Sequence, residues 1–305
     1  MQIFLPIAEI PVDLFLVIAM GAAVGFVSGL FGVGGGFLMT PFLIFIGVPP
    51  AVAVATGSMQ IAASSTTGVL NYWRRKTIDF PLAITLTAGG FVGSVLGVLF
   101  FNQMQQIGQL DLIIQLSFVT LMLSIGMLMI SDFLRSVWRT RGGRVRLPPK
   151  GAPPWAAGLP WQVTFKRSQL TTSVVPLVLL GTIIGFLGAV MGIGGGFMTV
   201  PALIYLFRVP TAVVVGTSML QILVTMLVVT MLHALTNGNV DILLGLILTV
   251  GGVIGAQFGT RAGQTLKGES FRLLLALLVF AVGVRFAIGL VVTPDDLFSI
   301  VALAR

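Results

Sequence analysis

No cysteine occurs in this chain, which excludes disulfide bonds, thiolate metal sites and cysteine nucleophiles. Acidic side chains are also scarce: nine Asp and Glu residues occur among 305, and each lies at or beyond the end of an apolar run. His233 is the only histidine. A metal-ligand cluster, a Walker lysine motif and a nucleophile elbow are all missing, so hydrolytic chemistry has little basis. We therefore expect no enzymatic activity, no metal and no cofactor.

Charged residues make up only 9% of the chain, against about 25% in a soluble domain, while 56% of the residues are hydrophobic. A soluble core of this length cannot bury so much apolar surface, which predicts that the lipid bilayer is the solvent. The net charge of +8 does not indicate a nucleic-acid partner, because eight of the seventeen basic residues cluster between Arg135 and Arg167. Such a cluster beside membrane spans is typical of a cytoplasmic loop, which can also contact anionic lipid.

The apolar runs form two sets of five, separated by a hydrophilic segment rich in Gly, Pro and basic residues. They lie at roughly 14–31, 37–48, 51–71, 80–101 and 111–131, and then at roughly 173–191, 197–207, 211–233, 241–260 and 271–292. We predict an all-α polytopic membrane protein of about ten helical segments. Its expected parts are a first transmembrane repeat (1–131), a basic cytoplasmic linker (132–172) and a second transmembrane repeat (173–305).

Lys and Arg predict the orientation of the chain, because cytoplasmic loops carry an excess of positive charge. The loop at 74–76 and the linker are basic, whereas the loop at 102–111 has neither Lys nor Arg. In the second half, position 208 and the segment 261–272 are basic, and 236–241 is not. Matching loops thus fall on opposite sides, so we expect two inverted repeats with both termini outside. The N-terminus lacks a basic n-region, and no removable signal peptide is expected.

One glycine-rich segment occurs twice, with GFVSGLFGVGGGFLMTPFL at 25–43 and GFLGAVMGIGGGFMTVPAL at 185–203. In each copy an apolar run breaks at the glycines, and a second, short run follows. Twelve helical residues rise about 18 Å, well below a hydrocarbon core of about 30 Å. We therefore expect broken or re-entrant helices, each pair of runs forming a hairpin bent at the glycines, with the two tips meeting near the middle of the membrane.

The glycine breaks also predict a binding site for an anion. Glycine disfavours the helix and adopts backbone angles closed to other residues, so the chain can expose main-chain amides at a new helix start. Such amides bind anions without a charged side chain. The alternative is that the glycines only allow close helix packing. The residues predicted to line the site are Gly34, Gly35, Gly36, Phe37, Gly194, Gly195, Gly196 and Phe197.

The third run of each half is polar near its start, with ATGSMQ at 55–60 and VGTSMLQ at 215–221. Hydroxyl and amide groups can donate to a sulfonate or carboxylate oxygen. The alternative is that these side chains bond backbone carbonyls or a neighbouring helix, as Ser and Thr often do in membrane helices. The candidates for substrate binding here and in the ninth run are Ser58, Gln60, Thr217, Ser218, Gln221 and Gln257.

Four further polar residues lie in or beside apolar runs. His233 could gate the pathway or relay a proton, although a lone polar residue at a membrane interface is more often structural. Arg285 could serve a similar role, or could snorkel toward the outer interface. Asp79 and Asp241 stand at matching helix starts, where an acid caps the first turn, and we predict a structural role for both. The glycine stripes that follow these acids predict tight helix packing.

The repeated motifs also allow a comparison with known families. The G-x-G-G-G-F blocks ending at Phe37 and Phe197 are each followed by a proline and then by TGSM or GTSM. Asp79 and Asp241 each begin a stretch that continues to G-G-x-x-G. In these features, which cover nearly the whole chain, the sequence resembles the sulfite exporter TauE/SafE family of membrane permeases. The resemblance implies transport of a small sulfur-containing anion, such as sulfite or the C2 sulfonate sulfoacetate, across a bacterial inner membrane.

We therefore predict a secondary transporter that exports such anions by alternating access. Export is favoured because an inside-negative potential of about 100 mV contributes about 2.3 kcal/mol per negative charge toward the outside. Two alternatives stay open: an ion-coupled uptake permease for the same anions, and a membrane subunit of a sulfur-metabolism complex without transport of its own. The expected partners are the anion and the lipid bilayer, and a homo-oligomer is left open.

Overall fold

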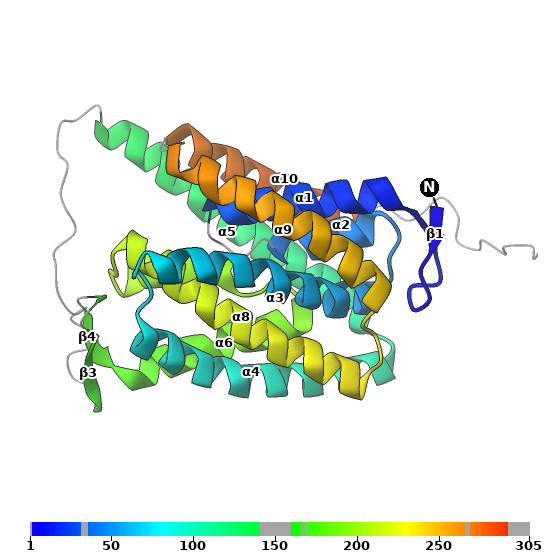
Figure 1. Cartoon of the computed structure of the whole chain (residues 1–305), viewed down its shortest axis with the longest axis horizontal. Coiled ribbons are helices and arrows are strands. Elements are labelled where there is room, and N and C mark those ends of the chain that lie inside the picture. The colour runs from blue at the N-terminus through cyan, green and yellow to red at the C-terminus, as the bar shows by residue number, and fades with distance from the viewer. Residues whose placement is uncertain are drawn as a thin grey trace, which may run out of the picture. The chain divides into compact units, whose positions relative to one another are not determined.

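The computed structural model describes residues 2–31, 36–140, 160–165, 167–168, 170–265 and 269–291. In these ranges the chain is mostly helical, with two short β-hairpins and no closed sheet (Figure 1). Five helices are long and apolar enough to cross a membrane. The prediction of an all-α polytopic membrane protein is confirmed.

The helices follow the predicted apolar runs. In the first half they are α1 (Leu14–Phe31), α2 (Gly36–Phe45), α3 (Pro50–Arg74), α4 (Phe80–Ile107) and α5 (Leu110–Thr140). In the second half they are α6 (Val174–Met191), α7 (Gly196–Pro201) with the π-helix η2 (Ala202–Leu206), α8 (Thr211–Thr236), α9 (Ile242–Thr265) and α10 (Glu269–Val291). Helix α5 extends beyond the expected end at 131, because no Gly or Pro occurs between that residue and Gly142.

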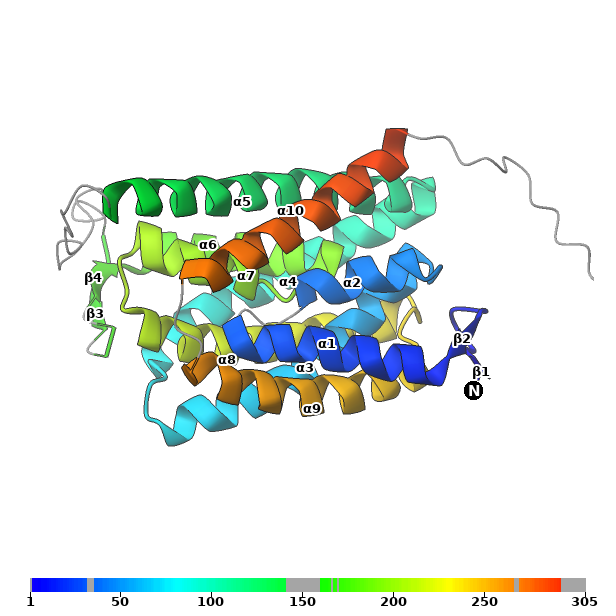
Figure 2. The same cartoon turned by 90° about the horizontal axis from the view of Figure 1, so that it is seen from above.

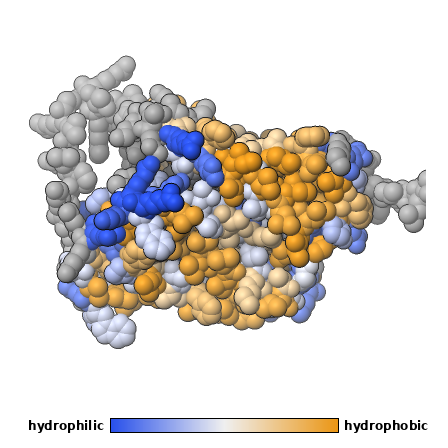
Figure 3. Space-filling view, in the orientation of Figure 1, coloured by the Kyte–Doolittle hydropathy of each residue, from blue (hydrophilic) through white to orange (hydrophobic). Residues whose placement is uncertain are grey.

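Large apolar side chains remain exposed on the outer faces of these helices. Leu99 on α4 is 60% exposed, and Phe258 on α9 is 58% exposed. In the space-filling view, hydrophobic residues spread across much of the face, and strongly hydrophilic residues gather toward one end (Figure 3). In a soluble protein such a surface would aggregate, whereas lipid tails solvate it.

Each half opens with a β-hairpin that the apolar pattern did not predict. Strand β1 (Gln2–Phe4) pairs antiparallel with β2 (Pro11–Asp13), and β3 (Gln162–Phe165) pairs antiparallel with β4 (Leu170–Ser173). The two hairpins lie at opposite ends of the helices, as inverted repeats require (Figure 1). Most of the second hairpin falls within the range that the sequence analysis assigned to the linker.

Asp79 and Asp241 each tie a hairpin to the helix that they cap. The Asp241 carboxylate accepts hydrogen bonds from the amide of Leu244 in α9 and from the amides of Ile7 and Ala8 in the β1–β2 turn. The Asp79 carboxylate likewise accepts from the amide of Leu82 in α4. Its second oxygen accepts from the amide and the hydroxyl of Ser168. The predicted capping role is confirmed, and the attachment of the hairpins is an addition to it.

We expect Asp241→Ala to lower the free energy of unfolding by about 2–4 kcal/mol. The substitution removes a helix cap, worth about 1 kcal/mol, and leaves buried amides of the β1–β2 turn without an acceptor. The measurement is thermal unfolding of the purified protein in detergent. Asp111→Ala is the matched control, because Asp111 is exposed in the first turn of α5. Equal shifts in both variants would contradict a structural role for the buried carboxylate.

By their contacts the helices divide into two compact units, each with elements from both halves of the sequence. The first unit contains α1 to α4 and α6 to α9. Within it, α1 packs along α9, and α6 packs along α4, so each close pair joins opposite halves. The second unit contains α5 and α10, where the rings of Phe118 and Phe286 stack with centroids 5.3 Å apart.

Glycines bring the backbones of the α1–α9 and α4–α6 pairs into direct contact. A Cβ added at Gly21 would lie 2.7 Å from the carbonyl oxygen of Leu248. A Cβ at Gly97 would lie 2.7 Å from the carbonyl oxygen of Phe186. Gly93 and Gly255 meet backbone atoms of α6 and α1 even more closely. The predicted packing role of the glycine stripes is confirmed.

Candidate functional site

The second predicted helix break occurs at its glycine cluster, and the first falls on residues 32–35, outside the described ranges. Helix α1 ends at Phe31 and α2 begins at Gly36; Gly34 and Gly35 lie outside the described residues. In the second copy α6 ends at Met191 and α7 begins at Gly196. Between them the backbone has positive φ at Gly192 (67°), Gly194 (78°) and Gly195 (72°), angles that L side chains rarely adopt. The prediction of a broken helix is therefore confirmed for the second copy.

The starts of α2 and α7 meet each other. The rings of Phe37 and Phe197 stack with centroids 5.0 Å apart and an interplanar angle of 14°. Both rings are buried. The Thr40 hydroxyl of α2 donates to the carbonyl oxygen of Gly192, 3.3 Å away in the other break. The prediction that the two tips approach each other is confirmed, and Figure 2 shows α2 and α7 from above.

Helices α3 and α8 pack against the two breaks with equivalent residues. Ile61 of α3 fills the space beside Gly36 and Gly194, and the side chain of Ile222 on α8 also faces Gly194. The preceding residues on the two helices are Gln60 and Gln221. Gln60 and Gln221 thus hold matching helix positions, and each side chain is almost fully buried.

The two glutamines differ in how their polar atoms are used. The Gln221 carbonyl oxygen accepts from the Thr199 hydroxyl of α7 at 3.2 Å, and its amide nitrogen donates to Thr225 at 3.1 Å. Gln60 lies against Gly252 of α9, and its oxygen Oε1 is buried without a hydrogen-bond partner. A buried amide oxygen of this kind is unfavourable unless a ligand, a water or a conformational change satisfies it.

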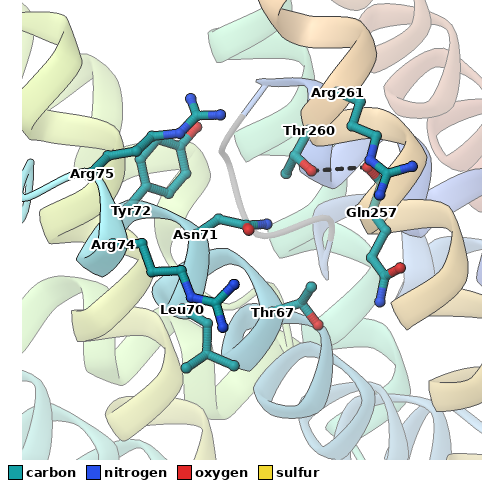
Figure 4. Close-up of a pocket in the computed structure, with 9 residues that line it drawn as sticks. All are labelled: Thr67, Leu70, Asn71, Tyr72, Arg74, Arg75, Gln257, Thr260 and Arg261. Carbon is teal, nitrogen blue, oxygen red and sulfur yellow. Dashed lines mark hydrogen bonds between the residues drawn. The ribbon is translucent and has the colours of Figure 1, made fainter.

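A basic pocket of about 500 Å³ lies between the end of α3 and α9 (Figure 4). Residues of α3 and the turn after it form one side, and Gln257, Thr260 and Arg261 of α9 form the other. The remaining lining residues are Thr67, Leu70, Asn71, Tyr72, Arg74 and Arg75. The pocket reaches deep, because Thr67 stands only seven positions from Gln60, about 10 Å of helix.

A second pocket of about 300 Å³ lies between the ends of α4 and α8. It is lined by uncharged polar residues, namely Asn102, Gln105, Gln106, Thr236 and Asn237. This pocket is shallow relative to the breaks, because Thr236 stands fifteen positions from Gln221, about 22 Å of helix. The two pockets thus occupy matching places in the two halves but differ in both charge and depth.

His233 and Phe101 lie next to the shallow pocket, since its lining residue Asn237 bonds the His233 ring. Both side chains are fully buried, and their rings meet edge to face with centroids 4.6 Å apart. His233 Nε2 lies 3.0 Å from the carbonyl oxygen of Ala189, and Nδ1 lies 3.1 Å from the Asn237 amide nitrogen. Since a carbonyl can only accept and an amide nitrogen can only donate, these bonds hold a neutral ring protonated at Nε2. This arrangement favours a closing role over a proton relay.

Comparisons with known proteins agree with this architecture. The family model of the sulfite exporter TauE/SafE matches residues 17–286. The chain belongs to the TauE/SafE family. It is 31% identical over 282 residues to a "Probable membrane transporter protein" of Xylella fastidiosa, covering 89% of this chain and 94% of that one. It is 25% identical over 276 residues to "Probable membrane transporter protein YunE" of Bacillus subtilis, covering 88% and 95%. No solved structure matches.

In this TauE/SafE protein each of the three predicted hydroxyl candidates already forms a hydrogen bond with a backbone group. Ser58 donates to the carbonyl of Val54, and Ser218 donates to that of Val215. The Thr217 hydroxyl accepts from the amide of Asp79. These contacts fit the alternative of backbone bonding, and a substrate role for the three residues stays a prediction.

The hydrogen bonds also correct the alignment of the two halves in this region. Thr217 accepts from the amide of Asp79, and Thr56 accepts from the amide of Asp241 at 3.0 Å. Thr56 therefore corresponds to Thr217, and Gln60 to Gln221. An alignment on the shared Ser-Met pairs would instead match Ser58 with Ser218, which is off by one position, because the second half has one residue more before α8.

The remaining candidates fall in different places. Gln257 lines the basic pocket, and its role in substrate binding stays a prediction. Arg285 lies on α10 in the other unit, where its guanidinium extends toward Gly289 and the end of the helix, the direction of snorkelling. The sequence analysis treated Arg74, Arg75 and Arg261 only as topology signals. Their convergence on one pocket could not be read from the sequence, because they are far apart along the chain.

Proposed function

We propose that this membrane protein exports small sulfur-containing anions, such as sulfite or a C2 sulfonate like sulfoacetate, by alternating access. The observation that carries the proposal is the meeting of the starts of α2 and α7, which come from opposite halves, with the buried carboxamide of Gln221 bonded to Thr199 of α7. A broken helix inside a membrane protein is tolerated where it lines a pathway, and its free amides attract negative charge.

The proposed site holds the anion with neutral donors. The amides of Gly196 and Phe197 open α7 and have no acceptor within the helix. Amide nitrogens of the two glutamines would add donors from α3 and α8. Neutral donors suit transport, because a fully charged partner would bind a small anion too tightly to release it. Movement of Phe37 and Phe197 apart would open space for the substrate between the two breaks.

The two pockets support export as the direction. The deep basic pocket includes Arg74, Arg75 and Arg261, which the positive-inside rule places in the cytoplasm. The shallow pocket at the ends of α4 and α8 is lined by uncharged residues. An anion would therefore be concentrated on the cytoplasmic side and released toward a neutral opening. The membrane potential drives a negative charge in the same direction.

The packing also suggests which bodies move. Since α1 packs along α9 and α6 along α4, a rocking motion of one sequence repeat against the other would break both glycine-lined interfaces. We therefore propose that the α1–α9 pair and the α4–α6 pair move as mixed bodies relative to α3 and α8. Asp241 and Asp79 tie a hairpin to each of these pairs.

Flux in proteoliposomes tests the proposal. Vesicles loaded with labelled sulfite or sulfoacetate should lose label faster than protein-free vesicles, and an inner-negative potassium diffusion potential should accelerate the loss. Accumulation that requires an imposed proton or sodium gradient would favour the uptake alternative. If no tested sulfur anion crosses under either condition while a partner protein co-purifies, the non-transporting subunit is the better description.

A further inference from the structure

We propose that the basic pocket between α3 and α9 is an anion-binding site in its own right, separate from the central site. Its ligand would be a small oxyanion group, such as sulfate, phosphate, a phosphodiester or a sulfonate that also carries a carboxylate. The proposal does not depend on transport, because it concerns binding at the pocket alone.

The charge and shape of the pocket carry this inference. Arg74, Arg75 and Arg261 line a cavity of about 500 Å³, within the range typical of small-molecule sites. Within the described ranges no carboxylate forms an ion pair with any of the three. Three guanidinium groups around one cavity repel one another, and an oxyanion would remove that repulsion. Guanidinium is also the side chain best suited to oxyanions, since it offers paired donors in a planar fork.

Neutral polar groups complete the pocket. Asn71 and Thr67 on α3 and Gln257 on α9 line the same cavity and supply amide and hydroxyl groups. An oxyanion with several oxygens can accept further hydrogen bonds beside those from the arginines, so these neutral groups can serve as additional donors. Tyr72 and Leu70 provide apolar surface for a short organic part of the ligand.

Two simpler explanations account for only part of the cluster. The positive-inside rule explains why basic residues lie on this face, but it does not require them to converge on one cavity. The dipole of α3 explains Arg74 in its last turn. It does not explain Arg261, because the last turn of α9 contains no basic residue and Arg261 precedes it.

The same phosphate chemistry could come from a soluble anion or from the head group of an anionic lipid, so the experiment has two arms. In the first, the full chain in neutral detergent is titrated with sulfate against chloride at constant ionic strength, and the unfolding midpoint is followed. In the second, the midpoint is compared between nanodiscs of neutral lipid and nanodiscs containing phosphatidylglycerol.

In the first arm we expect saturable stabilisation of the wild type by sulfate. Arg74→Gln and Arg261→Gln should each weaken the apparent affinity by about tenfold or more, as expected for loss of a charge-assisted hydrogen bond. Lys76→Gln is the matched control, because it removes the same charge from the adjacent exposed position and does not line the pocket. Unchanged midpoints in chloride alone, together with a single symmetric peak in gel filtration, show that a variant is folded.

The second arm identifies the source of the anion. If phosphatidylglycerol stabilises the wild type but not Arg261→Gln, and sulfate no longer adds to the effect, the occupant is a lipid head group. Absence of saturable stabilisation by both sulfate and anionic lipid overturns the proposal, as does an equal loss of affinity in Lys76→Gln. Because Gln60 does not line the pocket, loss of sulfate stabilisation in Gln60→Leu but not in Arg261→Gln would assign the sulfate to the central site and overturn the proposal.

Discussion

Flux of sulfite or sulfoacetate is expected to fall by about tenfold or more in each of the variants Gln60→Leu and Gln221→Leu, and below detection in the double variant. Each substitution keeps the approximate volume of the side chain and removes a donor that the proposed site offers to the anion. A hydrogen bond to a charged group contributes about 1.5–3 kcal/mol, and about 1.4 kcal/mol corresponds to a factor of ten. The measurement is initial flux in proteoliposomes at matched protein content.

The two single variants should differ in stability even though both lose flux. Gln221 makes two hydrogen bonds, to Thr199 and Thr225, so Gln221→Leu should lower the free energy of unfolding by about 1–3 kcal/mol. The oxygen of Gln60 has no partner, and Gln60→Leu should be less destabilising or neutral. Gln109→Leu, in the exposed turn before α5, is the control for flux and stability. Normal flux in the double variant would remove the carboxamides from the site.

The second large effect concerns folding: Gly255→Leu is expected to abolish recovery of folded protein from the membrane. Gly255 on α9 faces the backbone of Ala22 and Phe26 on α1, so a side chain there would collide with main-chain atoms that cannot move aside locally. Overpacking in a tight core costs about 1–3 kcal/mol even when side chains can adjust, and here the two helices would have to separate.

The inverted repeat supplies a test of the same effect. Gly93 on α4 faces Thr182 and Phe186 of α6 in the equivalent way, so Gly93→Leu should also prevent folding. Ile254→Leu is the matched control, because Ile254 neighbours Gly255 but is 50% exposed. The measurement is the yield of monodisperse protein in fluorescence-detected gel filtration. Normal yield for Gly255→Leu would mean that the α1–α9 pair does not form as described.

The helices, their order and the two breaks were predictable, because the physical causes are local. Apolar runs must become helices in lipid to satisfy their backbone groups, and clustered glycines such as Gly192, Gly194 and Gly195 interrupt them. The repetition of one motif also predicted that equivalent elements would come together, and the stacked Phe37 and Phe197 confirm it.

The sequence was less informative where function depends on which surfaces meet. Strands β3 and β4 are too short and too polar to stand out beside a basic linker. An alignment of α3 with α8 on their Ser-Met pairs would be off by one position, as the equivalent hydrogen bonds of Thr56 and Thr217 show. The arginines of α3 and α9 carried only a topology signal until the fold brought them to one pocket.

By itself the sequence determined that this protein is an all-helical membrane protein, that its two halves are inverted copies, and that each copy breaks at glycine. These properties follow from composition, local backbone freedom and the placement of charge, which require no knowledge of distant contacts. Only the tertiary structure decided that α1 pairs with α9 and α6 with α4, that Gln221 bonds to α7, and that three arginines line one cavity. Such pairings depend on the complementarity of surfaces far apart in the chain, because many helix arrangements satisfy the same apolar pattern in lipid.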